Sequence, residues 1–140
     1  GPEPLGNQFD GRWLFDRSRK KSVAVKNFIM DAKQVVGVGN IYASEALHRS
    51  GIHPSREAGR VSAARYETLA SDIRKVLQAA IVAGGTTLRD FANNDGEPGY
   101  FAQRLLVYGR DGQPCETCGK KISRLVIGQR SSFFCTRCQR

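Results

Sequence analysis

The 140-residue sequence has no apolar run long enough to span a lipid bilayer, and no signal peptide opens it. It also has no hydrolytic constellation, because it shows no Ser/His/Asp order and no paired carboxylates beside a histidine. Acidic residues are few, with 13 against 22 lysines and arginines, so the formal net charge is +9. We therefore expect a cytosolic protein whose partner is a nucleic acid or another anionic surface, with a generic basic protein as the alternative.

Cysteine is confined to the C-terminal end of the chain, where Cys115 and Cys118 form one C-x-x-C pair and Cys135 and Cys138 form another. This spacing is typical of a zinc ribbon, in which four protein ligands leave no coordination position open. The sequence therefore predicts one structural Zn²⁺ ion, with two disulfides or a redox pair as the alternatives. The two histidines, at positions 48 and 53, are distant from the cysteines in sequence and are interpreted as surface or packing residues.

The apolar pattern predicts a helical domain followed by a small β module. We expect a short helix within residues 23–30, a second at 40–49 with Asn40 as N-cap and Gly51 as stop, and a long helix after the cap Ser62. Residues 122–127 and 130–134 are predicted to form a hairpin in the cysteine module. The domain boundaries follow from these elements: a linker or tag remnant at 1–11, the helical domain at 12–104 and the zinc module at 105–140.

The turn at residues 35–40 contains two glycines but lacks the third glycine of a dinucleotide loop and the Lys-Ser/Thr of a P-loop. Backbone N–H groups at the start of the following helix suit a phosphate, and Asn40 adds a donor, although an ordinary helix entry is the alternative. The basic run at residues 17–21 and Arg130 beside the hairpin turn are further candidates for phosphate contacts. Solvated side chains are the alternative for both.

Several stretches together resemble the formamidopyrimidine-DNA glycosylase family, over about residues 12–140. Residues 33–47 and 51–54 resemble its helix–two-turn–helix, residues 84–91 and 95–101 its lesion-capping region, and residues 108–110, 129–134 and the four cysteines its terminal zinc finger. The related endonuclease VIII branch usually lacks the capping segment. The resemblance therefore favours the branch that removes oxidised purines such as 8-oxoguanine and formamidopyrimidines.

The resemblance implies a mainly α fold, in which a helix–two-turn–helix domain precedes a small antiparallel β zinc ribbon. It implies the damaged-DNA-binding half of a bifunctional DNA glycosylase and AP lyase of base excision repair. The family's catalytic Pro-Glu lies at the mature N-terminus of a β-sandwich domain, whereas Pro2-Glu3 here resembles the interdomain linker. We therefore expect a monomeric, bacterial, nucleoid-associated chain that binds double-stranded DNA at oxidised purines or abasic sites, beside an N-terminal catalytic domain of the same enzyme, and is inactive alone. A stand-alone zinc-ribbon nucleic-acid-binding module is the alternative.

The resemblance also assigns roles to individual residues. Lys26 and Asn40 are expected to hold phosphates around the extruded nucleotide, and Lys21 is a further DNA contact. Arg130 is expected to bind the phosphates that flank the lesion and to assist strand cleavage by δ-elimination. Base flipping is required because the glycosidic bond is inaccessible in a stacked duplex. The loop that closes over the flipped base is expected to include Thr87, Leu88, Arg89 and Tyr100.

Overall fold

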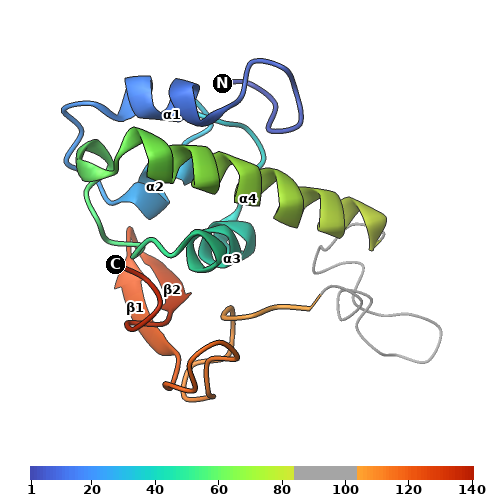
Figure 1. Cartoon of the computed structure of the whole chain (residues 1–140), viewed down its shortest axis with the longest axis vertical. Coiled ribbons are helices and arrows are strands. Elements are labelled where there is room, and N and C mark those ends of the chain that lie inside the picture. Colours follow the sequence, from blue (N-terminus) through green and yellow to red (C-terminus); the bar gives the residue numbers. More distant parts are fainter. Residues whose placement is uncertain (84–103) are drawn as a thin grey trace.

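The computed structural model describes residues 1–83 and 104–140, and Figure 1 shows its arrangement. A helical part is followed by a two-stranded antiparallel sheet, which confirms the predicted fold class. The elements in chain order are α1 (Gly11–Ser18), α2 (Val25–Met30), α3 (Asn40–Ser50), the 3₁₀ helix η1 (Ala58–Arg60), α4 (Ala63–Val82), β1 (Ser123–Ile127) and β2 (Arg130–Phe134).

Helix boundaries follow local capping chemistry. The Ser62 hydroxyl accepts a hydrogen bond from the backbone N–H of Arg65, which confirms the predicted start of α4. Gly51 adopts a left-handed conformation with φ 73° at the end of α3, as a C-terminal glycine commonly does. The predicted cap at the start of α3 is wrong: Gly39 is the N-cap, and Asn40 is the first helical residue. The Asn40 side chain is instead used in contacts distant in sequence.

The helical core forms around α4, which packs against α1 on one side and α3 on the other (Figure 1). The apolar stripe of α4 is buried through Tyr66, Leu69 and Ile73, as its 3.6-residue period predicts. Phe28 of α2 meets Tyr66 edge to face, with ring centroids 6.0 Å apart. This core holds α2 and α3 side by side and so sets the place of every side chain that they carry.

Residues 1–10 are packed onto the helical domain. Pro2, Pro4 and Phe9 are buried. Arg74 of α4 donates hydrogen bonds to the carbonyl oxygens of Gly6 and Phe9. The backbone N–H of Val36 donates to the Pro2 carbonyl, at 3.1 Å. This segment is therefore attached both to α4 and to the turn that precedes α3.

The hairpin packs through β2 on α3 (Figure 1). Its two-residue turn has positive φ at Gly128 (58°) and Gln129 (67°), the signature of a type I′ turn. A Cβ at position 128 would lie 2.6 Å from the Asn27 side-chain oxygen, so glycine lets the turn approach α2 closely. The hairpin tip is thus seated beside α2. Among the described residues, no helix has the length and apolar character needed to cross a membrane.

Candidate metal centre and nucleic-acid interface

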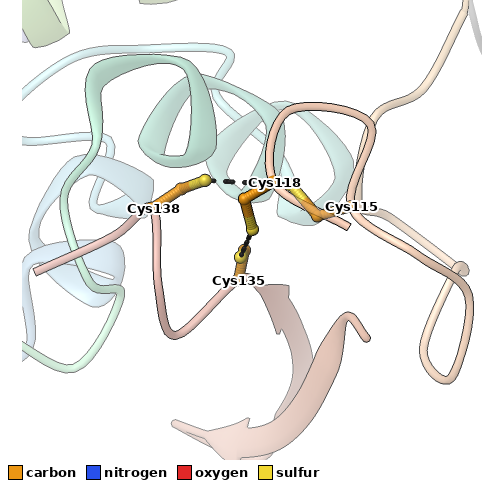
Figure 2. Close-up of side chains that lie close together, drawn as sticks. All are labelled: Cys115, Cys118, Cys135 and Cys138. Carbon is orange, nitrogen blue, oxygen red and sulfur yellow. Dashed lines mark hydrogen bonds between the residues drawn. The ribbon is translucent and has the colours of Figure 1, made fainter. Parts of the chain in front are cut away.

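The four cysteine sulfurs converge on one point (Figure 2) and lie within 4.8 Å of one another. The Sγ atoms of Cys115 and Cys138 are 3.8 Å apart, and those of Cys118 and Cys135 are 3.4 Å apart. These separations exclude disulfides, whose sulfurs lie about 2.05 Å apart. A tetrahedral zinc ion with Zn–S bonds of about 2.3 Å requires sulfurs roughly 3.8 Å apart, so the ligand geometry fits zinc.

Each cysteine pair forms a tight knuckle that supports its sulfurs. The backbone N–H of Gly119 donates to the Cys115 carbonyl, and that of Gln139 donates to the Cys135 carbonyl. Burial raises the pKa of the Cys115 thiol, but hydrogen bonds from the backbone N–H groups of Cys118 and Thr117 outweigh it and lower this pKa to about 7. Burial and the neighbouring cysteines raise the pKa of the Cys138 thiol to about 12, so the four thiols favour one thiolate at Cys115 and zinc must displace the remaining protons.

A second cluster joins the helical domain to the hairpin tip. The Lys26 ammonium of α2 donates a hydrogen bond to the Asn40 side-chain oxygen at the start of α3. The Asn40 side-chain nitrogen in turn donates to the Ser131 carbonyl of β2, at 3.0 Å. Lys26 is fully buried, whereas Arg130, which precedes Ser131, is exposed. The structure thus brings together the three predicted phosphate contacts, Lys26, Asn40 and Arg130.

The positive charges around this cluster favour the binding of an anion. Burial, followed by the positive charge of Arg130, lowers the pKa of Lys26 from 10.5 to about 8. Two cations therefore converge beside the N-terminus of α3, where the helix dipole adds partial positive charge. A phosphate oxygen placed here would relieve the repulsion between these groups, which makes the cluster an anion-binding site in chemical terms.

The turn before α3 is held by Trp13, Arg17 and Gln34, whose contacts with one another the sequence did not predict. The buried Gln34 accepts a hydrogen bond from the Trp13 indole on its backbone oxygen, at 2.7 Å, and another from Arg17 on its side-chain oxygen, at 2.6 Å. The Arg17 guanidinium also lies over the Trp13 ring. The backbone N–H of Gln34 donates to the Asp31 carbonyl. Only the folded chain places Trp13 and Arg17 beside this turn.

The basic run at residues 17–21 divides into two parts. Arg17 and Arg19 have structural contacts, since the Arg19 guanidinium donates to the Val61 carbonyl at 2.6 Å and covers the Phe15 ring. Lys20 and Lys21 are exposed and border a surface hollow of about 470 Å³ that extends to Asn27. Lys21 is therefore accessible on the same side as the hairpin turn, as a DNA contact requires.

Glu45 of α3 is a further site-shaping residue that sequence reasoning missed. Its carboxylate is 1% exposed and accepts hydrogen bonds from the backbone N–H groups of Leu106, Val107 and Tyr108, at 2.6, 2.9 and 2.8 Å. These contacts attach the chain entering the zinc module to the middle of α3. The available signal was an acid next to the apolar residues Ala46 and Leu47 of the predicted helix, although its partners are distant in sequence. Thr87, Leu88, Arg89 and Tyr100 lie outside the described residues.

Family comparisons cover both parts of the chain. Residues 1–92 match the model of the formamidopyrimidine-DNA glycosylase H2TH domain, in which H2TH denotes helix–two-turn–helix. Residues 112–140 match the model of a zinc finger found in FPG and IleRS. The second match agrees with the four converging sulfurs and establishes one structural zinc ion.

Curated relatives match along the whole chain. A formamidopyrimidine-DNA glycosylase of Syntrophotalea carbinolica is 67% identical over 140 residues, and one of Alteromonas mediterranea is 64% identical over the same length. In each case the match covers 100% of this chain and 52% of the relative. The chain therefore spans about half the length of the curated relatives it matches.

Solved structures agree with these relatives. The Fpg protein of Thermus thermophilus superposes with a TM-score of 0.87 at 39% identity, covering 99% of this chain and 53% of that one. A Lactococcus lactis Fpg variant in complex with Fapy-dG-containing DNA gives a TM-score of 0.88 at 32% identity, with coverage of 100% and 51%. The same species' Fpg with abasic-site DNA gives 0.86 at 30% identity, with the same coverage.

Proposed function

Because this chain belongs to the formamidopyrimidine-DNA glycosylase family, we propose that it is the damaged-DNA-binding part of a bifunctional DNA glycosylase and AP lyase. Its DNA partner is double-stranded and carries an oxidised purine, such as 8-oxoguanine or a formamidopyrimidine, or an abasic site. The related Fpg complexes with Fapy-dG-containing DNA and with abasic-site DNA support this substrate class. The process served is base excision repair.

The observation that carries the proposal is the junction of Lys26, Asn40 and Arg130 at the N-terminus of α3. Lys26 and Arg130 supply positive charge, and the first-turn N–H groups of α3 supply further donors. In our proposal these groups grip the phosphates around the lesion and so hold the strand while the damaged nucleotide rotates out of the stack. Arg130, as the exposed cation, binds the flanking phosphates and assists δ-elimination, and Lys21 adds an outer contact.

We assign the nucleophilic step to an N-terminal catalytic domain of the same enzyme. That step needs a free amine that forms a Schiff base with the sugar. Pro2 cannot supply it, because its nitrogen is in a peptide bond with Gly1. Its ring is also buried and its carbonyl is hydrogen-bonded to Val36. We therefore propose that the chain alone binds DNA without cleaving it.

We propose that the chain is divided into three parts. Residues 1–11 form an interdomain linker, residues 12–104 form the DNA-binding helical domain and residues 105–140 form the zinc finger. The lesion-capping loop with Thr87, Leu88, Arg89 and Tyr100 belongs to the helical domain. We propose a monomer that works at the nucleoid in the bacterial cytoplasm, because its substrate is chromosomal DNA and the relatives named above come from bacteria.

Two measurements on the full chain test the proposed function. Fluorescence anisotropy should show tighter binding to a duplex with a stable abasic-site analogue than to the undamaged duplex. Borohydride trapping on an 8-oxoguanine duplex should give no covalent adduct, while a full-length family member gives one. An adduct with this chain would overturn the assignment of catalysis to another domain. Equal binding to both duplexes would favour a stand-alone nucleic-acid-binding module.

A further inference from the structure

Gln139 follows the zinc ligand Cys138 in the sequence, and its side chain forms hydrogen bonds with both the zinc module and the helical domain. It is 2% exposed. Its side-chain oxygen accepts a hydrogen bond from the backbone N–H of the zinc ligand Cys135, at 2.8 Å. Its side-chain nitrogen donates to the Ile52 carbonyl just beyond α3, at 2.9 Å. One buried amide thus contacts both the metal centre and the helical domain.

The same amide determines which ring nitrogen of the buried His48 carries a proton. A backbone N–H can only donate and a carbonyl can only accept, so the contacts to Cys135 and Ile52 fix which end of the Gln139 amide is oxygen. That oxygen lies 3.2 Å from Nδ1 of His48, which is 8% exposed. The His48 Nδ1 must therefore carry a proton and donate it to Gln139.

These contacts lie at the end of α3 opposite the proposed phosphate contacts. His48 lies in the last turn of α3, about 12 Å along the helix from Asn40 at a rise of about 1.5 Å per residue. Next to it, the backbone N–H of Arg140 donates to the Gly51 carbonyl, at 3.0 Å, and the N–H of His53 donates to the Arg140 carbonyl, at 3.1 Å. The second cysteine knuckle and the C-terminal end of α3 are therefore one hydrogen-bonded unit.

We propose that Gln139 is a positioning residue that couples the zinc centre to α3. It supports the ligand Cys135 on one side and holds His48 and Ile52 on the other, so that metal binding sets the orientation of the helix that carries Asn40. Residues that hydrogen-bond near metal ligands commonly tune metal affinity in this way. The effect on DNA rests on the proposed function, whereas the effects on zinc and on His48 do not.

The first test is zinc affinity, measured by chelator competition on the full chain. Gln139→Ala should lower it by roughly 10- to 100-fold, because the backbone of Cys135 loses its partner. Gln113→Ala is the matched control, since Gln113 is an exposed glutamine of the same module, and should leave zinc affinity unchanged. Equal zinc affinity for the wild type and Gln139→Ala would overturn the proposal.

The second test needs no folded variant. Nitrogen-15 NMR of the zinc-bound wild type, above about pH 8 where an ordinary imidazole is neutral, should show the His48 proton on Nδ1. A proton on Nε2 alone would overturn the network, because two acceptors would then face each other. Where Gln139→Ala stays folded, the Nδ1 signature of His48 should be lost, and its full retention would contradict the role of Gln139.

The third test separates coupling from direct DNA contact. At saturating zinc, Gln139→Ala should weaken binding to the abasic-site duplex by roughly fivefold or more, with the salt slope unchanged because Gln139 contacts no phosphate. Wild-type DNA affinity in this zinc-loaded variant would overturn the coupling to α3. If the wild-type chain itself binds no damaged DNA, the proposed function fails, while zinc affinity and the His48 proton still decide the role of Gln139.

Discussion

Lys26 carries an ammonium group into a fully buried position, where it hydrogen-bonds Asn40 and faces the charge of Arg130. Burial and a nearby like charge both disfavour the protonated form, which explains the lowered pKa of about 8. A phosphate would act in the opposite direction, because it stabilises the ammonium. Lys26 and Arg130 thus share the cationic environment but differ in exposure, and two experiments can distinguish their roles.

DNA binding should depend on pH through Lys26. Above about pH 8 the free chain holds Lys26 neutral, so binding a phosphate must take up a proton, and affinity falls as pH rises. The slope of log affinity against pH should approach but not exceed −1 between about pH 8 and 10, because a single group takes up one proton. Anisotropy titrations across this range measure the slope.

Lys26→Met should remove most of this pH dependence, whereas Lys75→Met, a change at an exposed lysine of α4, should retain it. An unchanged slope in Lys26→Met would show that another group takes up the proton.

Arg130→Ala should weaken duplex binding and lower the salt slope by roughly one unit, because one phosphate contact and its released counterion are lost. Arg12→Ala removes an exposed arginine of α1 that pairs with Asp16, and should leave the slope unchanged. Titrations at several salt concentrations provide the measurement. If both variants keep the wild-type slope, Arg130 does not contact a phosphate.

α3 is the element on which both functional regions depend. Its first residue reaches β2 through Ser131, its middle holds residues 106–108 through Glu45, and its last turn meets Gln139 through His48. The opposite side of the helix packs against α4. α3 therefore supports both the predicted phosphate contacts and the zinc module, which explains the burial of Glu45 and His48 along it.

Glu45→Gln should weaken the attachment of the zinc module to α3, because an amide NH₂ replaces one of the two carboxylate oxygens that accept hydrogen bonds from backbone N–H groups. We expect a loss of about 1–3 kcal/mol in the free energy of unfolding. Urea denaturation followed by circular dichroism measures it, with Glu67→Gln at an exposed site of α4 as the control. An equal loss of stability in the control variant would contradict the proposal that Glu45 attaches the zinc module to α3.

The molecule is built as a helical body with the zinc module docked beneath α3 (Figure 1), and it carries a formal charge of +9. The described helical part has its own apolar core, whereas the module has a small one around Val107, Ile122 and Phe133. Metal coordination must therefore supply much of the folding free energy of the module. The two parts should respond differently to loss of zinc.

Chelation should unfold the zinc module and remove most of the DNA affinity, while the helical domain stays folded. Trp13 is the single tryptophan of the chain, and its indole is bound to the Gln34 carbonyl, so its fluorescence reports on the helical domain alone. We expect this fluorescence to persist and the anisotropy signal for DNA to vanish. Retention of both the far-UV circular dichroism spectrum and DNA binding after complete zinc removal would contradict the structural role of the metal.

Features that depend on local spacing were predictable from the sequence. The four zinc ligands follow from two C-x-x-C pairs, and α4 follows from its cap and its apolar period. The hairpin strands follow from the two short runs on either side of the turn at Gly128, with an observed start one residue later than predicted, at Ser123. Each of these features requires residues that are neighbours along the chain, so its physical cause is contained in a short segment.

Features that depend on contacts between distant segments appeared only in the folded structure. Asn40 bridges Lys26 and Ser131 and is not a helix cap, and half of the basic run is occupied by structural contacts. Gln139 and His48 are 91 positions apart, and no local pattern marks either of them. Such groups acquire their roles because burial removes water and leaves each polar atom to find a partner in the protein. Which partner it finds depends on how the helices and the zinc module pack.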